Sequence, residues 1–416
     1  MTAKPATLRL LFVCLMAVSV ALPIALISLA KLALLLCAVA WLVFERRDRG
    51  QSQALQAQWT PRVVMLALLA FAASLLWSTG SDIQPLGPLN KHAKLVLIPV
   101  LLFLLRSRRE VLLALAAFAL GQVFLLGSTG LLLLGVALPW ARANDAASAY
   151  AVFSSYLDQS MISATFAALC WHLRGLVPGR YGAPIAAALA LLALACVFFV
   201  FRSRTGHLIG IAVVSLALMW ELPRRLRAGA LLVPLAVALL AVATVPAVRD
   251  RLQTAATEAQ AYADSGNVVT SSGIRLNLWQ RSLQALAQRP WIGSGVGSWV
   301  HEYSRLQALH APDSGIEFHS NPHQEFLLWG VELGLPGMLL LAGLLAAICR
   351  DGARGESATR RATLSLVLSL VLASLFNCAL YDALIGDFYC VLLGLLLALA
   401  AYPATGDRQR LDTRAA

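Results

Sequence analysis

Uninterrupted apolar runs recur from one end of this chain to the other, and their length constrains the fold more than any other feature. A helix needs about 17–25 mostly apolar residues to cross the hydrocarbon core of a bilayer. Runs of that order, bounded by charged or turn-forming residues, predict about twelve membrane-spanning helices. We expect them at 9–24, 26–44, 62–79, 93–105, 111–138, 157–173, 183–201, 206–220, 229–247, 326–349, 362–379 and 388–402. The sequence therefore predicts an all-α, polytopic integral membrane protein.

The composition agrees with a membrane protein and disfavours several other classes. Hydrophobic residues make up 59% of the chain and charged residues 13%, against about 45–50% and 25% in soluble domains. The seven cysteines lie mostly inside or beside the apolar runs, where thiols act as small buried hydrophobes, so no disulfide framework is expected. The net charge of +12 is better explained by basic membrane loops than by nucleic-acid binding.

The basic residues predict the orientation of the chain. Lys and Arg concentrate in the short cytoplasmic loops of membrane proteins. Every second connection is rich in them, and these connections and the C-terminal tail hold Arg46, Arg47, Arg49, Arg62, Arg106, Arg108, Arg109, Arg174, Arg180, Arg224, Arg225, Arg227, Arg350, Arg354, Arg360, Arg361, Arg408, Arg410 and Arg414. The alternate short connections carry little beyond Lys31, Lys91 and Arg142. Both termini are therefore expected in the cytoplasm.

One outer connection is much longer than the others. The predicted organisation is helices one to nine in 1–247, an outer loop over 248–325, helices ten to twelve in 326–402 and a cytoplasmic tail over 403–416. Within the loop, residues 274–288 carry apolar side chains near helical spacing, which predicts an amphipathic helix at the membrane surface. Arg281 and Arg289 on this helix are expected to be solvated or to contact lipid.

Polar residues interrupt the apolar pattern at four places, and the topology puts all four on the outer face. They supply the candidate site residues Arg202, Arg204, Arg275, His319, His323, Asn377 and Asp382. Structural explanations compete for some of them: an arginine at a helix end, such as Arg202, often extends to lipid phosphates. Nearby, Asp387 fits an N-cap of the last helix.

The two histidines raise the question of a metal. His319 and His323 are four residues apart, a spacing that suits metal ligands on a helix. Pro322 lies between them, so a regular helix is not expected there, and no third ligand stands at motif spacing. We expect neither a metal nor another cofactor.

These residue types suit a substrate that carries a diphosphate. Arginine binds phosphate oxygens through a fixed fork of donors and stays protonated. Histidine near a helix N-terminus tends to stay neutral and can accept a proton from a hydroxyl. Arginines that neutralise a diphosphate leaving group, together with a histidine that activates a hydroxyl, fit transfer from a polyprenyl diphosphate.

Four motifs strengthen this interpretation. "HQEFLLWGVELGLPG" (323–337) resembles the signature of the O-antigen ligase family, with Gln324 where asparagine is usual. "SRTG" (203–206) resembles the family's Ser-Arg turn, and 271–299 resembles its Arg-x3-Trp loop with a glycine run at 293–297. "FNCALYDALIGDFY" (376–389) is similar to the ligases' penultimate outer turn. The motifs cover roughly residues 200–390.

The resemblance implies a metal-independent, inverting glycosyltransferase of the bacterial inner membrane with its active site facing the periplasm. The donor would be a preassembled glycan on undecaprenyl diphosphate, and the acceptor a sugar hydroxyl of lipid A–core. His323 would be the general base or a hydrogen-bond partner of the diphosphate, and Arg204 and Arg275 would bind the diphosphate, with Arg202, His319 and Asn377 as further substrate contacts. Asp382 would support His323 or the acceptor, and the glycines 293–297 form either a mobile rim or a structural turn.

Three other functions compete with ligation. An O-antigen polymerase would use a second lipid-linked repeat as acceptor, but the tight connection at 202–206 favours ligation over it. A protein O-oligosaccharyltransferase would use Ser or Thr. A transporter is disfavoured because transporters place charges near the midplane of the membrane, often in inverted repeats.

Overall fold

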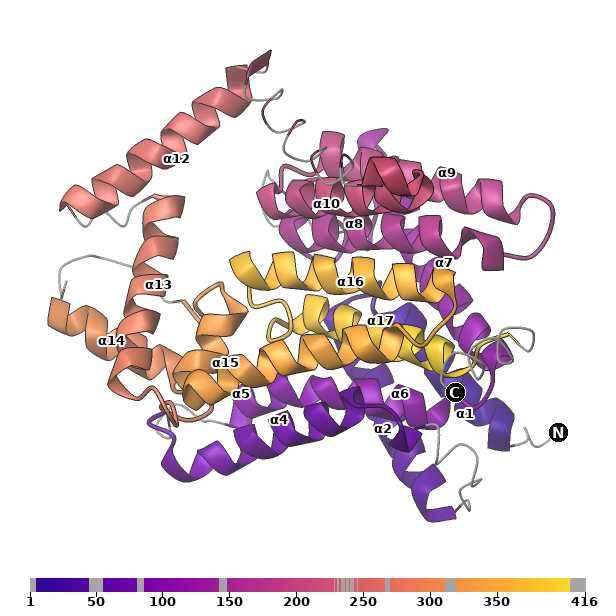
Figure 1. The fold of residues 1–416 in the computed structure, drawn as a ribbon, viewed down its shortest axis with the longest axis horizontal. Helices are drawn as coiled ribbons and strands as arrows, with labels where there is room; N and C mark the ends of the chain where they lie inside the picture. The colour runs from indigo at the N-terminus through magenta and orange to yellow at the C-terminus, as the bar shows by residue number, and fades with distance from the viewer. Residues whose placement is uncertain are drawn as a thin grey trace.

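The computed structural model describes residues 5–44, 55–80, 86–141, 148–227, 246–265, 270–310 and 319–404, with isolated positions between 228 and 245. Throughout these residues the regular structure is helical and contains no strand (Figure 1). The predicted all-α fold is therefore confirmed. The longer helices are α1 (Pro5–Ser19), α2 (Ile24–Phe44), α4 (Thr60–Ser74), α5 (Leu86–Ala93), α6 (Leu97–Leu104), α7 (Arg108–Leu133), α8 (Tyr156–Leu173), α9 (Gly182–Ala195), α10 (Arg204–Glu221), α12 (Pro246–Ser265), α13 (Ser271–Gln288), α14 (Trp299–His310), α15 (Glu325–Gly352), α16 (Ser357–Phe376) and α17 (Ala383–Ala401).

Eight helical segments of the described chain are long and apolar enough to cross a membrane. They are Ile24–Val43, Thr60–Trp77, Leu86–Leu104, Arg108–Leu133, Gly182–Val200, Glu325–Gly352, Ser357–Phe376 and Ala383–Ala401. The chain is therefore a multi-pass membrane protein, but the predicted count of about twelve is not confirmed. The first predicted span is the shorter apolar helix Ala6–Ser19. α8 and α10 occupy two further predicted places without being among the eight, and only scattered positions of the predicted span 229–247 are described.

The helices form a central group with one further group on either side. α15, α16 and α17 lie between the N-terminal helices on one side and α8–α10 on the other (Figure 1). α17 contacts α6, α7, α15 and α16. Of the residues in its apolar stretch, 89% are buried within the protein. The segments Ile24–Val43 and Gly182–Val200 are at least as apolar but only 28% buried, so the central position of α17 explains its burial.

Polar contacts define the two ends of the bundle. At one end, the starts of α1 and α7 meet through Arg9 and Glu110 (2.5 Å), and Arg108 pairs with Glu356 near the start of α16 and with the carbonyl of Tyr402. We call this the terminal end. At the opposite end, where α10, α15 and α17 begin, α13 and α14 cover the bundle (Figure 1). We call it the loop end.

The long connection contains α12, α13 and α14, and the predicted helix 274–288 lies within α13. α13 packs against α14 and α15. Arg281 was expected to be solvated or in contact with lipid, and this prediction is wrong. Its side chain is buried, and its Nε donates to Gln307 of α14 (3.1 Å) and its Nη1 to Gln284 (2.9 Å). Periodicity alone could not reveal that α14 covers this face.

Candidate active site

The turn before α15 carries His323 in a strained backbone conformation. Gln324 is the N-cap of α15, and its side chain accepts a hydrogen bond from the N–H of Leu327, so the helix begins at Glu325. His323, immediately before this cap, has φ of 50° and is the only described non-glycine residue with a positive φ. Left-handed backbone costs a non-glycine residue about 1–2 kcal/mol, so neighbouring contacts must hold it.

Asn321 supplies those contacts on one side. Its Oδ1 accepts a hydrogen bond from the N–H of His323 (2.9 Å), and its Nδ2 donates to Oδ1 of Asp382 (2.9 Å). Trp279 of α13 donates from Nε1 to the carbonyl of Pro322 (3.1 Å). The turn is therefore tied to α13 and to the start of α17 at once.

Arg275 lies close to both His323 and Arg204. Its charge interacts with that of Arg204, across from it at the start of α10, and with the imidazole of His323. Burial and the charge of Arg204 lower the pKa of the Arg275 guanidinium, which nonetheless stays protonated. Within the described part of the chain neither arginine has an ion-pair partner. Two neighbouring guanidiniums without a carboxylate favour an anion between them.

The electrostatics keep His323 neutral. Burial, the positive charge of Arg275 and the neighbouring His319 lower the pKa of His323 from 6.5 to about 4. The rings of His319 and His323 meet edge to face with their centroids 5.9 Å apart, and Nε2 of His319 is buried. Among the described residues no group of three His, Cys, Asp or Glu side chains is placed to hold a metal ion.

Asp382 occupies the N-cap position of α17, although its side chain bonds to Asn321 rather than to the helix. Burial raises the pKa of Asp382, while Lys94, Lys91 and the bond from Asn321 oppose the shift. Lys94 also donates from Nζ to the carbonyls of Tyr381 (2.9 Å) and Asp382 (2.6 Å). The carboxylate thus reaches His323 through Asn321, without touching the imidazole directly.

The other predicted residues do not all join this cluster. Arg202 and Arg204 are both exposed at the turn before α10, but the charge that acts on Arg275 is that of Arg204. Asn377 is buried at the end of α16, where its Nδ2 lies 3.8 Å from the sulfur of Met161. Asp387 was considered as an N-cap, but it lies inside α17 and pairs with Lys31 (2.6 Å). That interpretation is wrong because α17 begins five residues earlier than the predicted span.

A glycine-rich loop docks on α15 next to the site. Gly334 breaks the helix with φ of 74°, which frees the carbonyls of the preceding turn. The N–H of Ser294 donates to the carbonyl of Val331 (2.7 Å), and that of Gly295 to the carbonyl of Glu332 (2.9 Å). The N–H of Gly297 donates to Oε1 of the Glu332 side chain (2.7 Å). These bonds favour a structural turn over a mobile rim.

Sequence reasoning missed His92 and gave no partner to Glu325 or Glu332. Buried His92 on α5 bonds Glu332 (Nε2–Oε2 2.7 Å) and stacks on Phe71. Glu325, fully buried, accepts from the N–H of Leu380 (2.9 Å) and from Nε1 of Trp329 (3.0 Å). The only sequence signal was the presence of charged residues within apolar segments, which is costly unless they are paired. The pairing itself joins distant segments and is invisible in the sequence.

The fold and the site define a class: a multi-pass, all-helical membrane protein with cationic side chains gathered at the loop end of its bundle. Residues 187–342 match the family model described as O-antigen ligase, which confirms the resemblance predicted from the motifs. The matched segment runs from α9 into α15 and includes Arg204, Arg275 and His323, whereas Asp382 and Asn377 lie beyond it. No match was found among curated proteins. The family is one of glycosyltransferase-like membrane enzymes, and the match indicates ligase- or polymerase-type function with lipid-linked glycan substrates.

Proposed function

We propose that this protein is an O-antigen ligase that transfers a preassembled glycan from undecaprenyl diphosphate to a sugar hydroxyl of lipid A–core at the periplasmic face of the inner membrane. One observation carries the proposal. Arg204, Arg275 and His323 come from three separate segments of the matched region, and the charge of Arg275 acts on both Arg204 and the imidazole of His323 at one end of the bundle.

The two arginines suit the donor diphosphate. Neither is compensated by a carboxylate within the described residues, so a bound diphosphate replaces their mutual repulsion with attraction. As the bond between the anomeric carbon and the diphosphate oxygen breaks, its electron pair moves onto that oxygen. Guanidiniums that bind the diphosphate also stabilise the charge that grows on it in the transition state.

His323 suits the acceptor hydroxyl. The hydroxyl oxygen attacks the anomeric carbon from the face opposite the diphosphate, which inverts the configuration, and its proton passes to the neutral imidazole. A pKa of about 4 makes the free imidazole a weak base. Donor binding brings negative charge beside Arg275 and offsets the main charge that lowers this pKa. Substrate binding therefore strengthens the base just when it is required.

The tight connection before α10 favours ligation over polymerisation. A π-helical turn at Cys196–Val200 is followed by α10 at Arg204, with Ser203 as N-cap. A polymerase would more often carry a second large outer loop with its own arginines at this point. Transfer to a protein hydroxyl remains the alternative if lipopolysaccharide is unaffected by loss of the protein.

Deletion of the gene, followed by separation of lipopolysaccharide by size, tests the reaction. We expect intact core without O-chain, together with accumulated lipid-linked polymer. Retention of a single attached repeat would identify a polymerase instead. Unchanged lipopolysaccharide would overturn the proposal.

Purified variants test the site. With lipid-linked glycan and lipid A–core, His323→Ala and Arg275→Ala should each lower transfer at least about 100-fold. His323→Gly should be equally inactive but more stable than His323→Ala, because glycine adopts positive φ without cost. Arg180→Ala, an exposed arginine outside the site, is the matched control and should keep full activity. Wild-type turnover by either site variant would remove that residue from the mechanism.

A further inference from the structure

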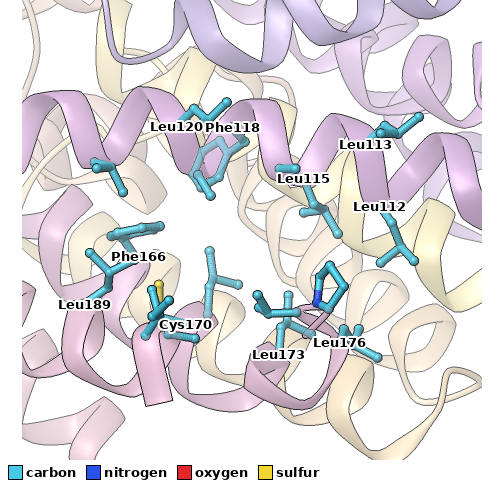
Figure 2. Close-up of a pocket in the computed structure, with 18 of the residues that line it drawn as sticks. Leu112, Leu113, Leu115, Phe118, Leu120, Phe166, Cys170, Leu173, Leu176 and Leu189 are labelled. Carbon is cyan, nitrogen blue, oxygen red and sulfur yellow. The ribbon is translucent and has the colours of Figure 1, made fainter. Parts of the chain in front are cut away.

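An apolar groove opens between α7, α8 and α9, away from the candidate active site (Figure 2). Its volume is about 880 Å³, within the range of about 300–1,000 Å³ typical of ligand pockets. Side chains of α7, among them Leu115 and Phe118, face Phe166 and Cys170 of α8 across the space (Figure 2). The lining is apolar except for Arg108 and Arg109.

Small residues on α7 and α9 create the groove, and larger residues form its walls. Ala116 and Ala119 on α7 and Ala186 on α9 line the groove where longer side chains would close it. Leu120 is 68% exposed and Ile185 is 56% exposed, so the groove is open to the side of the bundle. In a bilayer this opening faces lipid chains, which are as apolar as the lining.

The two arginines stand at the terminal end of the groove, where α7 begins. Arg108 is already paired with Glu356 (2.8 Å) and with the carbonyl of Tyr402 (3.1 Å). Arg109 is exposed, and its guanidinium has no ion pair or hydrogen bond with any described residue. Its charge therefore lies beside an apolar groove at the level where lipid headgroups begin.

We propose that this groove binds an anionic phospholipid of the leaflet at the terminal end, with an acyl chain between α7 and α9 and its phosphate on Arg109. The charge of Arg109 favours an anionic phospholipid over a polyprenyl tail and over a zwitterionic phospholipid. The far end of a polyprenyl tail carries no charge and would leave Arg109 uncompensated. A zwitterionic phospholipid has a phosphate but no net charge to balance the guanidinium, whereas each basic residue near the surface favours anionic lipid.

α8 connects the groove to the candidate active site. α8 lines the groove with Phe166 and Leu169 and begins at Tyr156, whose phenol lies near Arg275. A chain that fills the gap between α7 and α9 stabilises the position of α8 by adding the dispersion contacts that an open groove lacks. Lipid binding should therefore raise the thermal stability of the protein.

Native mass spectrometry of the purified full-length protein tests the proposal. Dioleoyl phosphatidylglycerol and dioleoyl phosphatidylcholine share their acyl chains and differ in net charge. We expect tighter retention of phosphatidylglycerol, and Arg109→Gln should weaken it about fivefold. Ala116→Trp should prevent binding by filling the groove from an exposed position.

Two control variants show whether the loss of lipid binding is specific to the groove. Arg360→Gln removes an exposed charge from α16, and Ala40→Trp adds the same bulk to exposed α2, with neither residue lining the groove. Both should bind phosphatidylglycerol as the wild type does. Equal retention of the two lipids, or unchanged binding in Ala116→Trp, would overturn the proposal. Undecaprenyl phosphate that displaces phosphatidylglycerol in the wild type but fails to bind Ala116→Trp would also overturn it, because the groove would then hold the donor's tail.

Discussion

A single residue, His323, shows how the protein holds a reactive side chain in place. Its positive φ is maintained by Asn321 on one side and by the start of α15 on the other. Strained residues persist only where surrounding structure over-determines them, and they concentrate at functional sites. The backbone geometry therefore points to the same residue as the motif and the electrostatics.

The lowered pKa of His323 predicts the acid limb of activity. A general base must be neutral, and His323 loses its neutral form only as the pH falls through about 4. We expect kcat/KM for the donor to be constant from pH 7 down to about 5 and to fall below that. The decrease in kcat should begin at a higher pH than the decrease in kcat/KM, since the bound diphosphate raises the pKa of the imidazole.

A pH series on detergent-solubilised enzyme measures both limbs, with thermal unfolding at each pH to separate loss of structure from loss of activity. An imidazole that only donates a hydrogen bond to the diphosphate would work equally well when protonated. Activity that persists below pH 4 in a folded protein would therefore assign His323 to diphosphate binding rather than to base catalysis.

Among the elements, α15 organises the loop end through its break at Gly334. The break gives the glycine-rich loop free carbonyls to bond, and it leaves no room for a larger residue: a Cβ on Gly334 would lie 2.5 Å from the carbonyl oxygen of Pro290. Glu332, two residues earlier, joins the loop to His92 on α5. One buried carboxylate thus connects three segments far apart in the sequence.

Glu332 should be a stability residue of this element. Removing one partner of a buried, hydrogen-bonded pair typically costs about 3–5 kcal/mol. We expect Glu332→Ala to lower the free energy of unfolding by about that amount, measured by denaturant titration in detergent, and Glu332→Gln to lose less because its amide oxygen can still accept from Gly297.

Glu221→Ala is the matched control, because Glu221 pairs with Arg174 where both side chains are partly exposed (40% and 32%). Such pairs contribute about 0–1 kcal/mol. A loss in Glu332→Ala no greater than in this control would show that the buried pair does not hold the loop.

At the scale of the whole molecule, charge separates the two ends of the bundle. Arg108, Arg174 and Arg354, which the sequence places in predicted cytoplasmic loops, form polar contacts at or near the terminal end, as does Arg9 at the start of the first predicted span. The site residues lie at the loop end. If the terminal end faces the cytoplasm, the site faces the periplasm.

Labelling of single cysteines in a cysteine-free background tests this orientation. Ser320 at the loop end and Ala353 at the terminal end are both exposed. A membrane-impermeant maleimide should label Ser320→Cys in intact spheroplasts and Ala353→Cys only after permeabilisation. The reverse pattern would place the site in the cytoplasm and exclude lipid A–core as the acceptor on the periplasmic side.

The sequence by itself determined the helical class, most of the spans and the identities of three clustered residues. Long apolar runs in a bilayer form helices, because each helix satisfies its own backbone hydrogen bonds. Short motifs led to Arg204, Arg275 and His323, and the family match covers all three. These features are local, so they can be read without knowing the fold.

Tertiary structure alone decided which polar residues meet. Lys31 with Asp387, His92 with Glu332 and Asn321 with Asp382 pair across at least 61 positions of the chain. It also decided that Arg281 is buried by α14 and that small residues leave a groove between α7 and α9. Each of these depends on which helix faces are apposed. Helix apposition is set by the packing of the whole bundle, so no window of sequence contains it.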